Sequence, residues 1–204
     1  MKIQGVVVVI ILILNLSFGI EAASFTSYSK NKMLGTQVKL NYDIVTMGSD
    51  KYAKFLIEKT AAGHVAFGIG SSMSSADIVL IQRTNNVVTL TDCRLTGQMA
   101  PTCGESEEAW SFYTSQSESS DLGTSSMKVE IKRKLAASGS DSDKAITEGS
   151  ENTFIYSYTT NDAAVQHDTT GTKGTISINL SSYALIRVLG IWTLFTALSM
   201  ITFL

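Results

Sequence analysis

The sequence is poor in the residues from which catalytic and metal sites are usually built. Its 204 residues include two histidines, His64 and His167, and two cysteines. Two histidines cannot supply a three-histidine metal site or the copper sites of a monooxygenase. The chain also has no Gly-x-Ser-x-Gly, His-Glu-x-x-His or P-loop motif. These absences argue against an autonomous hydrolase.

The sequence also lacks an excess of charge of either sign. It has 16 lysine and arginine residues against 18 aspartate and glutamate residues, which gives a net charge of −2. A nucleic-acid-binding surface needs a basic stripe, which this charge balance argues against. Nucleic acid is therefore not expected as a partner, whereas the charge excludes no particular protein partner.

The first 23 residues have the pattern of a secretory signal peptide. Lys2 gives a weakly basic start, residues 5–16 form an apolar run, and the small residues Ala22 and Ala23 follow it. The alternative, an uncleaved membrane anchor, fits less well because this apolar run is short for a bilayer span. We therefore divide the chain into a signal peptide (1–23), one folded domain (24–180) and a C-terminal hydrophobic segment (181–204).

The C-terminal segment is apolar from Tyr183 to Leu204, with Arg187 as its main interruption. A run of this length can just span a bilayer. Ser181 and Ser182 precede it, as small residues precede a glycolipid (GPI) anchor signal, although the polar spacer is short. The alternative is a transmembrane tail helix, but no basic residue follows Leu204. Either form places the protein in the secretory pathway, on the outer face of the plasma membrane or on a lumenal membrane surface.

Cys93 and Cys103 are expected to form one disulfide bond. A secreted chain is in an oxidising compartment, where two cysteines usually pair. The alternatives are a redox-active pair or two metal ligands. Nine residues separate the cysteines, a gap that suits neither a CxxC redox motif nor a zinc knuckle.

One N-glycosylation sequon lies outside the signal peptide. It consists of Asn179, Leu180 and Ser181. Because it stands directly before the C-terminal hydrophobic segment, the sequence leaves its use open.

The region between the two ends has the pattern of an all-β domain. Short alternating or apolar runs recur between breaks rich in Gly, Ser, Asn and Asp, and no stretch has a sustained helical period. Strands are expected over Val38–Ile44, Tyr52–Glu58, His64–Ile69, Ile78–Gln82, Val87–Thr91, Ser111–Tyr113, Met127–Arg133, Phe154–Tyr158 and Thr175–Leu180. Many short strands at close spacing predict a sandwich or a barrel. Two Ser-rich segments, Thr114–Ser126 and Ser138–Ser150, are expected to be solvated loops.

Four groups of residues resemble, in order, the motifs of one protein family. The first is a glycine-rich strand with a methionine and an Ala-Asp-hydrophobic segment after it: His64 to Gly70, Met73, and Ala76 to Leu80. The second is Thr91-Asp92 with Gly97 and Pro101, and the third is Val129 to Arg133 with Asp141 and Asp143. The fourth is Phe154 to Tyr158, His167, Gly171, and Gly174 to Leu180. Together, over roughly His64 to Leu180, they resemble the DOMON family.

The resemblance implies a fold and a cofactor. The fold would be an immunoglobulin-like DOMON β-sandwich of antiparallel strands. The haem-binding branch, which includes the cytochrome domain of cellobiose dehydrogenase and plant GPI-anchored cytochromes b, holds haem b between a methionine and a histidine. The matching positions are Met73 and His167, which would be the axial ligands of the haem iron. Gly68 and Gly70 have no side chains, so a flat macrocycle could approach their strand closely.

The resemblance also implies a role. An iron with both axial positions filled favours electron transfer over substrate chemistry. We therefore expect an electron carrier rather than an enzyme, with a membrane reductase or a small redox molecule as its partner. The alternative is a haem-free DOMON module that binds carbohydrate or another small ligand, or that forms part of a surface coat. In that case Met73 fills a gap or lies at the surface, and His167 is solvated.

The other conspicuous side chains are expected to serve the fold. His64 is a rival for a place beside the haem, as a hydrogen-bond donor to a propionate, but a solvated histidine at a strand start is preferred. Arg133 is expected to form an exposed pair with Asp141 or Asp143. Trp110 and the aromatic residues Phe154, Tyr156 and Tyr158 are expected in the core or in cross-strand pairs.

Overall fold

A computed structural model of the protein describes residues 25, 27–61, 63–72, 74–84, 86–97, 101–104, 109–117, 119–123, 126–137, 143–159 and 172–182. The signal peptide (1–23) and the C-terminal segment from residue 183 lie outside the described residues, so both remain predictions. Within the described ranges every regular element is a strand, and no helix there could cross a membrane. The expectation of an all-β fold is confirmed.

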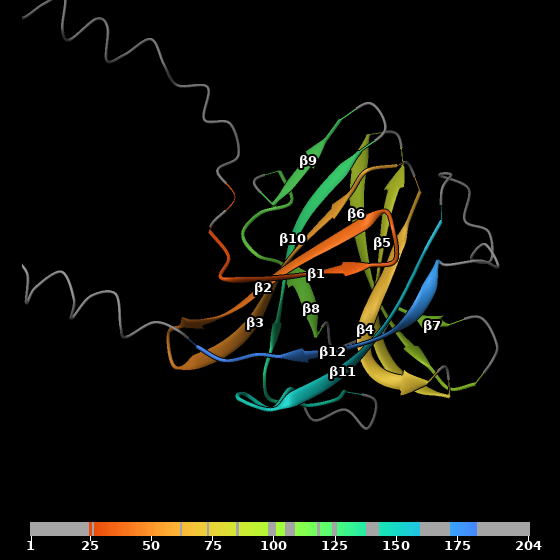
Figure 1. Ribbon diagram of the computed structural model, residues 1–204. Coiled ribbons are helices and arrows are strands. Elements are labelled where there is room, and N and C mark those ends of the chain that lie inside the picture. The colour runs from red at the N-terminus through yellow and green to blue at the C-terminus, as the bar shows by residue number, and fades with distance from the viewer. Residues whose placement is uncertain are drawn as a thin grey trace, which may run out of the picture.

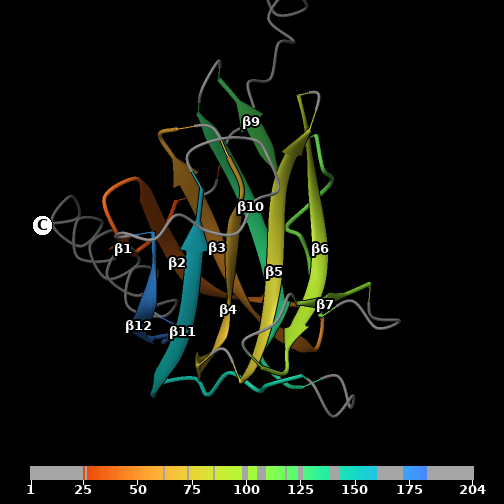
Figure 2. The same ribbon diagram turned by 90° about the vertical axis from the view of Figure 1, so that its right-hand side faces the viewer.

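The domain consists of two antiparallel sheets that face each other as a sandwich (Figures 1 and 2). Sheet A has the order β1 (Lys30–Leu34), β2 (Val38–Met47), β3 (Asp50–Lys59), β10 (Met127–Lys134) and β8 (Trp110–Phe112), and β9 (Ser120–Leu122) also pairs with β10. Sheet B has the order β12 (Lys173–Asn179), β11 (Glu151–Tyr158), β4 (Val65–Ser72), β5 (Ser75–Thr84), β6 (Val87–Leu95) and β7 (Thr102–Cys103).

Every strand expected from the sequence is present, with bounds that differ by a few residues, and three further strands occur. These are β1, β7 and β9. The expectation that Thr114–Ser126 is entirely loop is wrong, because Ser120–Leu122 pairs with Val129–Met127 of β10. The sequence Ser-Asp-Leu has no apolar alternation, and its backbone pairs with β10 without burying a run of side chains. β1 is similar, since only Leu34 of its residues is fully buried.

The core lies between the two sheets and follows from the alternation along each strand. Val38, Leu40 and Tyr42 of β2 point inward, and residues of β3, β4, β10 and β11 meet them. An aromatic cluster occupies the centre, with ring centroids 5.1 to 6.0 Å apart: Phe55, Phe67, Trp110 and Phe154. The expected core positions of Trp110, Phe154 and Tyr158 are confirmed, and Tyr156 is half-buried against the same core.

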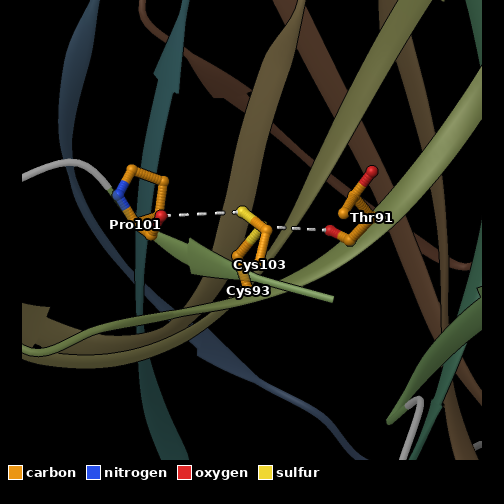
Figure 3. The surroundings of a disulfide bond; sticks show 4 residues. All are labelled: Thr91, Cys93, Pro101 and Cys103. Atoms are coloured by element: carbon orange, nitrogen blue, oxygen red, sulfur yellow. Dashed lines mark hydrogen bonds between the residues drawn. A yellow bond between two sulfur atoms is a disulfide. The ribbon is translucent and has the colours of Figure 1, made fainter. Parts of the chain in front are cut away.

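The expected disulfide joins β6 to β7. Cys93 and Cys103 are paired directly across the two antiparallel strands, and their Cα atoms are 4.0 Å apart. Cys93 is buried and Cys103 is exposed, with the carbonyl oxygens of Thr91 and Pro101 near their sulfur atoms (Figure 3). The bond therefore fastens the short strand β7, which has only two residues, to the edge of sheet B.

Opening this disulfide is expected to lower the free energy of unfolding by about 2–3 kcal/mol, because the loop it closes regains entropy in the unfolded chain. Urea unfolding of the Cys93→Ala/Cys103→Ser variant and of the oxidised wild type measures the difference in the free energy of unfolding. A reducing agent should destabilise the wild type and leave the variant unchanged. Equal midpoints for the oxidised wild type and the variant would show that β7 is held by other contacts.

Candidate functional site

The outward face of sheet B is apolar at its centre. An antiparallel sheet in a sandwich usually turns polar side chains to this side. Here the strand registers place Ile155, Gly68, Ile78 and Cys93 in one row across β11, β4, β5 and β6. A second hydrophobic cluster forms around this row and contains Ala76, Ile78, Cys93, Leu95 and Ile155, with the half-buried Ala66 and Leu80 against it. We call these residues the outer apolar face; Figure 2 shows sheet B from this side.

The two glycines singled out in the sequence lie in or next to this face, on β4. A side chain on Gly68 would collide with the backbone of Asp77 and Ile78 on the neighbouring strand. A Cβ on Gly70 would lie 2.6 Å from the Cβ of Ala76, and Gly70 has a φ of 154°, which L-residues rarely adopt. The pairing register of β4 and β5 shifts between Ile69 and Ser72. Both glycines therefore serve the close approach of β4 and β5, and the approach of a macrocycle remains a prediction.

Met73 lies outside the described residues, but both of its neighbours are described. Ser72 ends β4, Ser74 precedes β5, and their hydroxyl oxygens are 2.7 Å apart. Both serines are exposed. The residues on either side of Met73 are therefore polar and exposed, and they stand at one end of sheet B.

His167 also lies outside the described residues, and its flanks meet at the other end of sheet B. The Tyr158 backbone N–H donates to the Thr172 carbonyl at 2.8 Å, and the Thr159 N–H donates to the His64 carbonyl at 3.1 Å. His64 Nδ1 and Thr159 Oγ1 share a further hydrogen bond of 3.2 Å. The chain thus leaves sheet B at Thr159 and returns at Thr172, beside the start of β4.

The two ends of β4 are far apart. Val65 pairs with Tyr158, while Ser72 lies seven residues further along, which is about 23 Å in a strand. His167 is five residues from Thr172, and five residues reach at most about 17 Å. For both predicted ligands to bind one iron, His167 has to lie closer to the Met73 turn than its own flanks do. His64 cannot replace it, since His64 belongs to the far end of the same strand.

A buried ion pair connects the two sheets close to the Met73 turn. Asp77 of β5 contacts the guanidinium of Arg133 on β10 and accepts a hydrogen bond of 2.8 Å from Nε1 of Trp110. The backbone N–H of Lys144 also donates to Asp77, at 3.2 Å. Asp77, Arg133 and Trp110 are each at most 2% exposed. Because Asp77 follows Met73 by four residues, this clamp fixes the start of β5 and hence the turn before it.

We expected Arg133 to form an exposed pair with Asp141 or Asp143. The expected exposure is wrong, because Arg133 is buried, and the expectation missed its buried partner Asp77. Arg133 is 1% exposed, and its ion pair is with Asp77, 56 residues earlier in the chain. Asp141 lies outside the described residues, and Asp143 is half-buried. The partners meet because the inward faces of β5 and β10 oppose each other, which no local spacing in the sequence reveals.

Asp92 is a second buried carboxylate beside the clamp, and sequence reasoning gave it no role of its own. Its Oδ2 accepts hydrogen bonds from the backbone N–H groups of Ala109 (2.6 Å) and Trp110 (3.3 Å). The pKa of Asp92 is raised from 3.8 to about 6, mainly by burial and in smaller part by the charges of Asp77 and Asp143, while the two backbone hydrogen bonds lower it. Its position in the Thr91-Asp92 motif was the one available signal.

Asp92 is expected to make the protein less stable as the pH rises. A folded-state pKa of about 6 against 3.8 means that the folded protein holds more protons between these values. The contribution of Asp92 to the free energy of unfolding therefore falls from pH 4 to pH 6, by at most about 3 kcal/mol. Asp92→Asn keeps an acceptor oxygen but never ionises. Urea unfolding at several pH values should show the stability of the variant rising relative to that of the wild type between pH 4 and pH 6, and parallel profiles would contradict the assignment.

Within the described ranges, the side chains offer no group of three or more His, Cys, Asp or Glu residues placed to hold a metal ion. The described part of the site therefore consists of the outer apolar face, the clamp and Asp92. The two predicted ligands, Met73 and His167, lie outside the described residues, which include only their flanks.

Comparison with known proteins identifies the architecture. The model of the DOMON domain family matches residues 35–159. This match begins well before His64, where the resemblance seen in the sequence begins, and it ends before His167; Gly68, Gly70 and Met73 lie inside it. No curated protein sequence matches the chain.

Two solved structures share the fold. The cytochrome domain of cellobiose dehydrogenase from Myriococcum thermophilum is 14% identical, with a TM-score of 0.53 over 70% of this chain and 74% of that one. The cytochrome b domain of pyranose dehydrogenase from Coprinopsis cinerea is 10% identical, with a TM-score of 0.54 over 69% of this chain and 76% of that one. At these identities the likeness concerns the fold alone.

Proposed function

Because this chain belongs to the DOMON family, we propose that it is an extracytoplasmic, membrane-anchored module that binds haem b and carries single electrons. Met73 and His167 would hold the iron, as thioether and imidazole donors, on the outward side of sheet B. Two solved structures that share its fold are cytochrome domains, which favours this branch of the family.

The outer apolar face is the observation that supports the proposal most strongly. A macrocycle needs apolar side chains around it, and this face supplies them where an antiparallel sheet is ordinarily polar. Ala76, Ile78, Cys93, Leu95 and Ile155 are each at most 9% exposed, so these side chains are buried rather than open to solvent. Its central row contains the side chains of Ile155, Ile78 and Cys93 on either side of Gly68, with no charged group among them. The residues present therefore fit an apolar, flat group in character. When bound between two axial donors, haem accepts and releases one electron.

The chain's own residues would position this group rather than react with a substrate. The clamp of Asp77 and Arg133 holds the start of β5 and would thereby support the neighbouring position of Met73 in the proposed site. Thr159 and Thr172 fix the two ends of the segment that carries His167. An electron carrier must hold its cofactor in place and leave it accessible to a redox partner. The proposed partner is a membrane reductase or a small redox molecule.

The proposed location follows from the ends of the chain and from the disulfide. Cys93–Cys103 is the kind of bond that persists in an oxidising compartment. A signal peptide over 1–23, a domain over 24–180 and a hydrophobic anchor over 181–204 would place this domain outside the cytoplasm. Release from membranes by a phosphatidylinositol-specific phospholipase would identify the anchor as a glycolipid rather than a transmembrane helix.

An absorption spectrum tests the proposal directly. The protein is purified from a secreting host supplied with haem, and spectra are recorded before and after dithionite. A shifted Soret peak and a sharp reduced α-band are expected from a low-spin b-type haem. A well-folded protein that stays colourless after addition of haem would exclude electron transfer through haem.

A haem-free module that binds carbohydrate or another small ligand, or that serves as a coat protein, is the second candidate. It is favoured by the distance between the Met73 turn and the flanks of His167, which stand at opposite ends of β4. It is also favoured by the end of the family match at residue 159, before His167. The outer apolar face would then accept the apolar side of a ligand ring, and the protein would have no absorption in the visible range.

A further inference from the structure

The sequon Asn179-Leu180-Ser181 is a motif that the proposed function does not use. It is the only Asn-x-Ser/Thr sequence after residue 23. Asn179 is the last residue of β12, and all three residues are described. We propose that Asn179 carries an N-linked glycan. This inference rests on the proposed extracytoplasmic location.

The alternation along β12 turns the acceptor outward. Ile178 and Leu180 are 0% exposed and hold the end of the strand in the core. Asn179 lies between them, on the face that it shares with the exposed Thr175 and Ser177. β12 is also the edge strand of sheet B, so only β11 pairs with it (Figure 2). A glycan on this side chain would stand in solvent without displacing the core.

The contacts of Asn179 are compatible with glycosylation. Its Nδ2 donates one hydrogen bond, of 3.3 Å, to the Gly149 carbonyl at the surface. An amide nitrogen has two hydrogens, so one can be replaced while the other keeps this contact. A lipid-linked oligosaccharide is the co-reactant: its anomeric carbon forms a bond to Nδ2, its bond to the lipid pyrophosphate breaks, and Nδ2 loses a proton.

The glycan would add to a protection that this edge already has. Lys30 Nζ donates to the carbonyl of Asn179 at 2.9 Å and to the hydroxyl of Ser181 at 2.7 Å. Lys32 Nζ donates to the carbonyl of Ser177 at 2.7 Å. Lysine side chains of β1 thus occupy carbonyl groups that a foreign strand would otherwise pair with. A glycan at the end of β12 would further block strand addition at this edge.

The glycan would also restrict the approach to the proposed electron-transfer site. Asn179 pairs with Glu151, at the same end of sheet B as Ser72 and the Met73 turn. Two strand spacings, about 10 Å, separate β12 from β4 at this end. A redox partner would therefore approach the outer apolar face from the side of β6 and β7.

The test is enzymatic deglycosylation of the full chain made in a eukaryotic secretory host. Peptide N-glycosidase removes an N-glycan and converts its asparagine to aspartate, so mass spectrometry reads residue 179 in the wild type without any variant. The wild type and Ser181→Thr, which keeps the sequon, are expected to shift by one glycan on a gel. Asn179→Gln and Ser181→Ala, which remove it, are expected not to shift.

A positive control separates the outcomes. Met47→Asn creates a sequon with Gly48 and Ser49 in the exposed turn between β2 and β3. If this variant gains a glycan while residue 179 stays an unmodified asparagine, the inference is overturned and the location stands. If neither position is modified, the chain does not pass through the glycosylating compartment, and both the inference and the proposed location are overturned.

Discussion

Replacing Asp77 by alanine is expected to lower the free energy of unfolding by about 3–5 kcal/mol, among the largest effects of any single substitution in the domain. The change leaves the Arg133 guanidinium, 1% exposed, without its carboxylate. Nε of Arg133 already has no hydrogen-bond partner among the described residues, so other contacts cannot compensate fully. Trp110 Nε1 loses its acceptor at the same time. Urea unfolding of the wild type and the variant measures the difference.

Two further variants separate charge from shape. Asp77→Asn keeps an oxygen for Trp110 Nε1 but removes the negative charge, so its cost reports the ion pair. Asp50→Ala breaks an exposed pair with Lys134 and is expected to leave stability nearly unchanged. If Asp77→Ala and Asp50→Ala cost the same, the buried pair does not clamp the two sheets as inferred.

The alternating pattern predicted most of the strands because the burial of alternate side chains defines them. Val129 and Ile131 of β10 and Phe67 and Ile69 of β4 are buried, and the sequence shows them at every second position. β9 has no such pattern. Its three residues form a strand because β10 offers them an unpaired edge, and a partner far along the chain cannot be seen in a local window.

The partner of Arg133 shows the same limit for side chains. Its nearest acidic residues in the downstream sequence, Asp141 and Asp143, suggested a local exposed pair. Asp77 reaches Arg133 across the sandwich, because odd-numbered residues of both β5 and β10 point inward. The alternation of side chains along a strand predicts whether an arginine is buried. The identity of its partner depends on how the two sheets pack.

The outer apolar face could be anticipated only in part. Ala66, Gly68 and Gly70 alternate with apolar residues, so the sequence indicated a strand with two non-polar faces. That Ile78, Cys93 and Ile155 lie in the same row as Gly68 depends on the registers of three strand pairs. The sequence spacing between Met73 and His167 likewise contained no information about which end of sheet B each flank would occupy.

Met73→Ala and His167→Ala are each expected to abolish the low-spin haem spectrum and to weaken haem binding at least about 10- to 100-fold. Loss of a ligand should cost at least as much as loss of a residue that only supports one. Each variant removes one axial donor, so the remaining donor cannot keep the iron six-coordinate from the protein alone. Met73→His should restore six-coordination and lower the reduction potential, since a second imidazole stabilises ferrous iron less than a thioether does. Haem titration followed by absorbance measures binding and spin state together.

Two control variants test whether the loss of the low-spin spectrum is specific to Met73 and His167. Met33→Ala removes another methionine, 54% exposed on β1 of sheet A, and should leave the spectrum unchanged. His64→Ala removes the only other histidine. His64 stands at the end of β4 opposite Ser72, so its loss should also preserve low-spin haem. If His64→Ala destroys the low-spin spectrum and Met73→Ala preserves it, the iron lies at the Thr159 end of sheet B, and the pair of ligands proposed from the sequence is wrong.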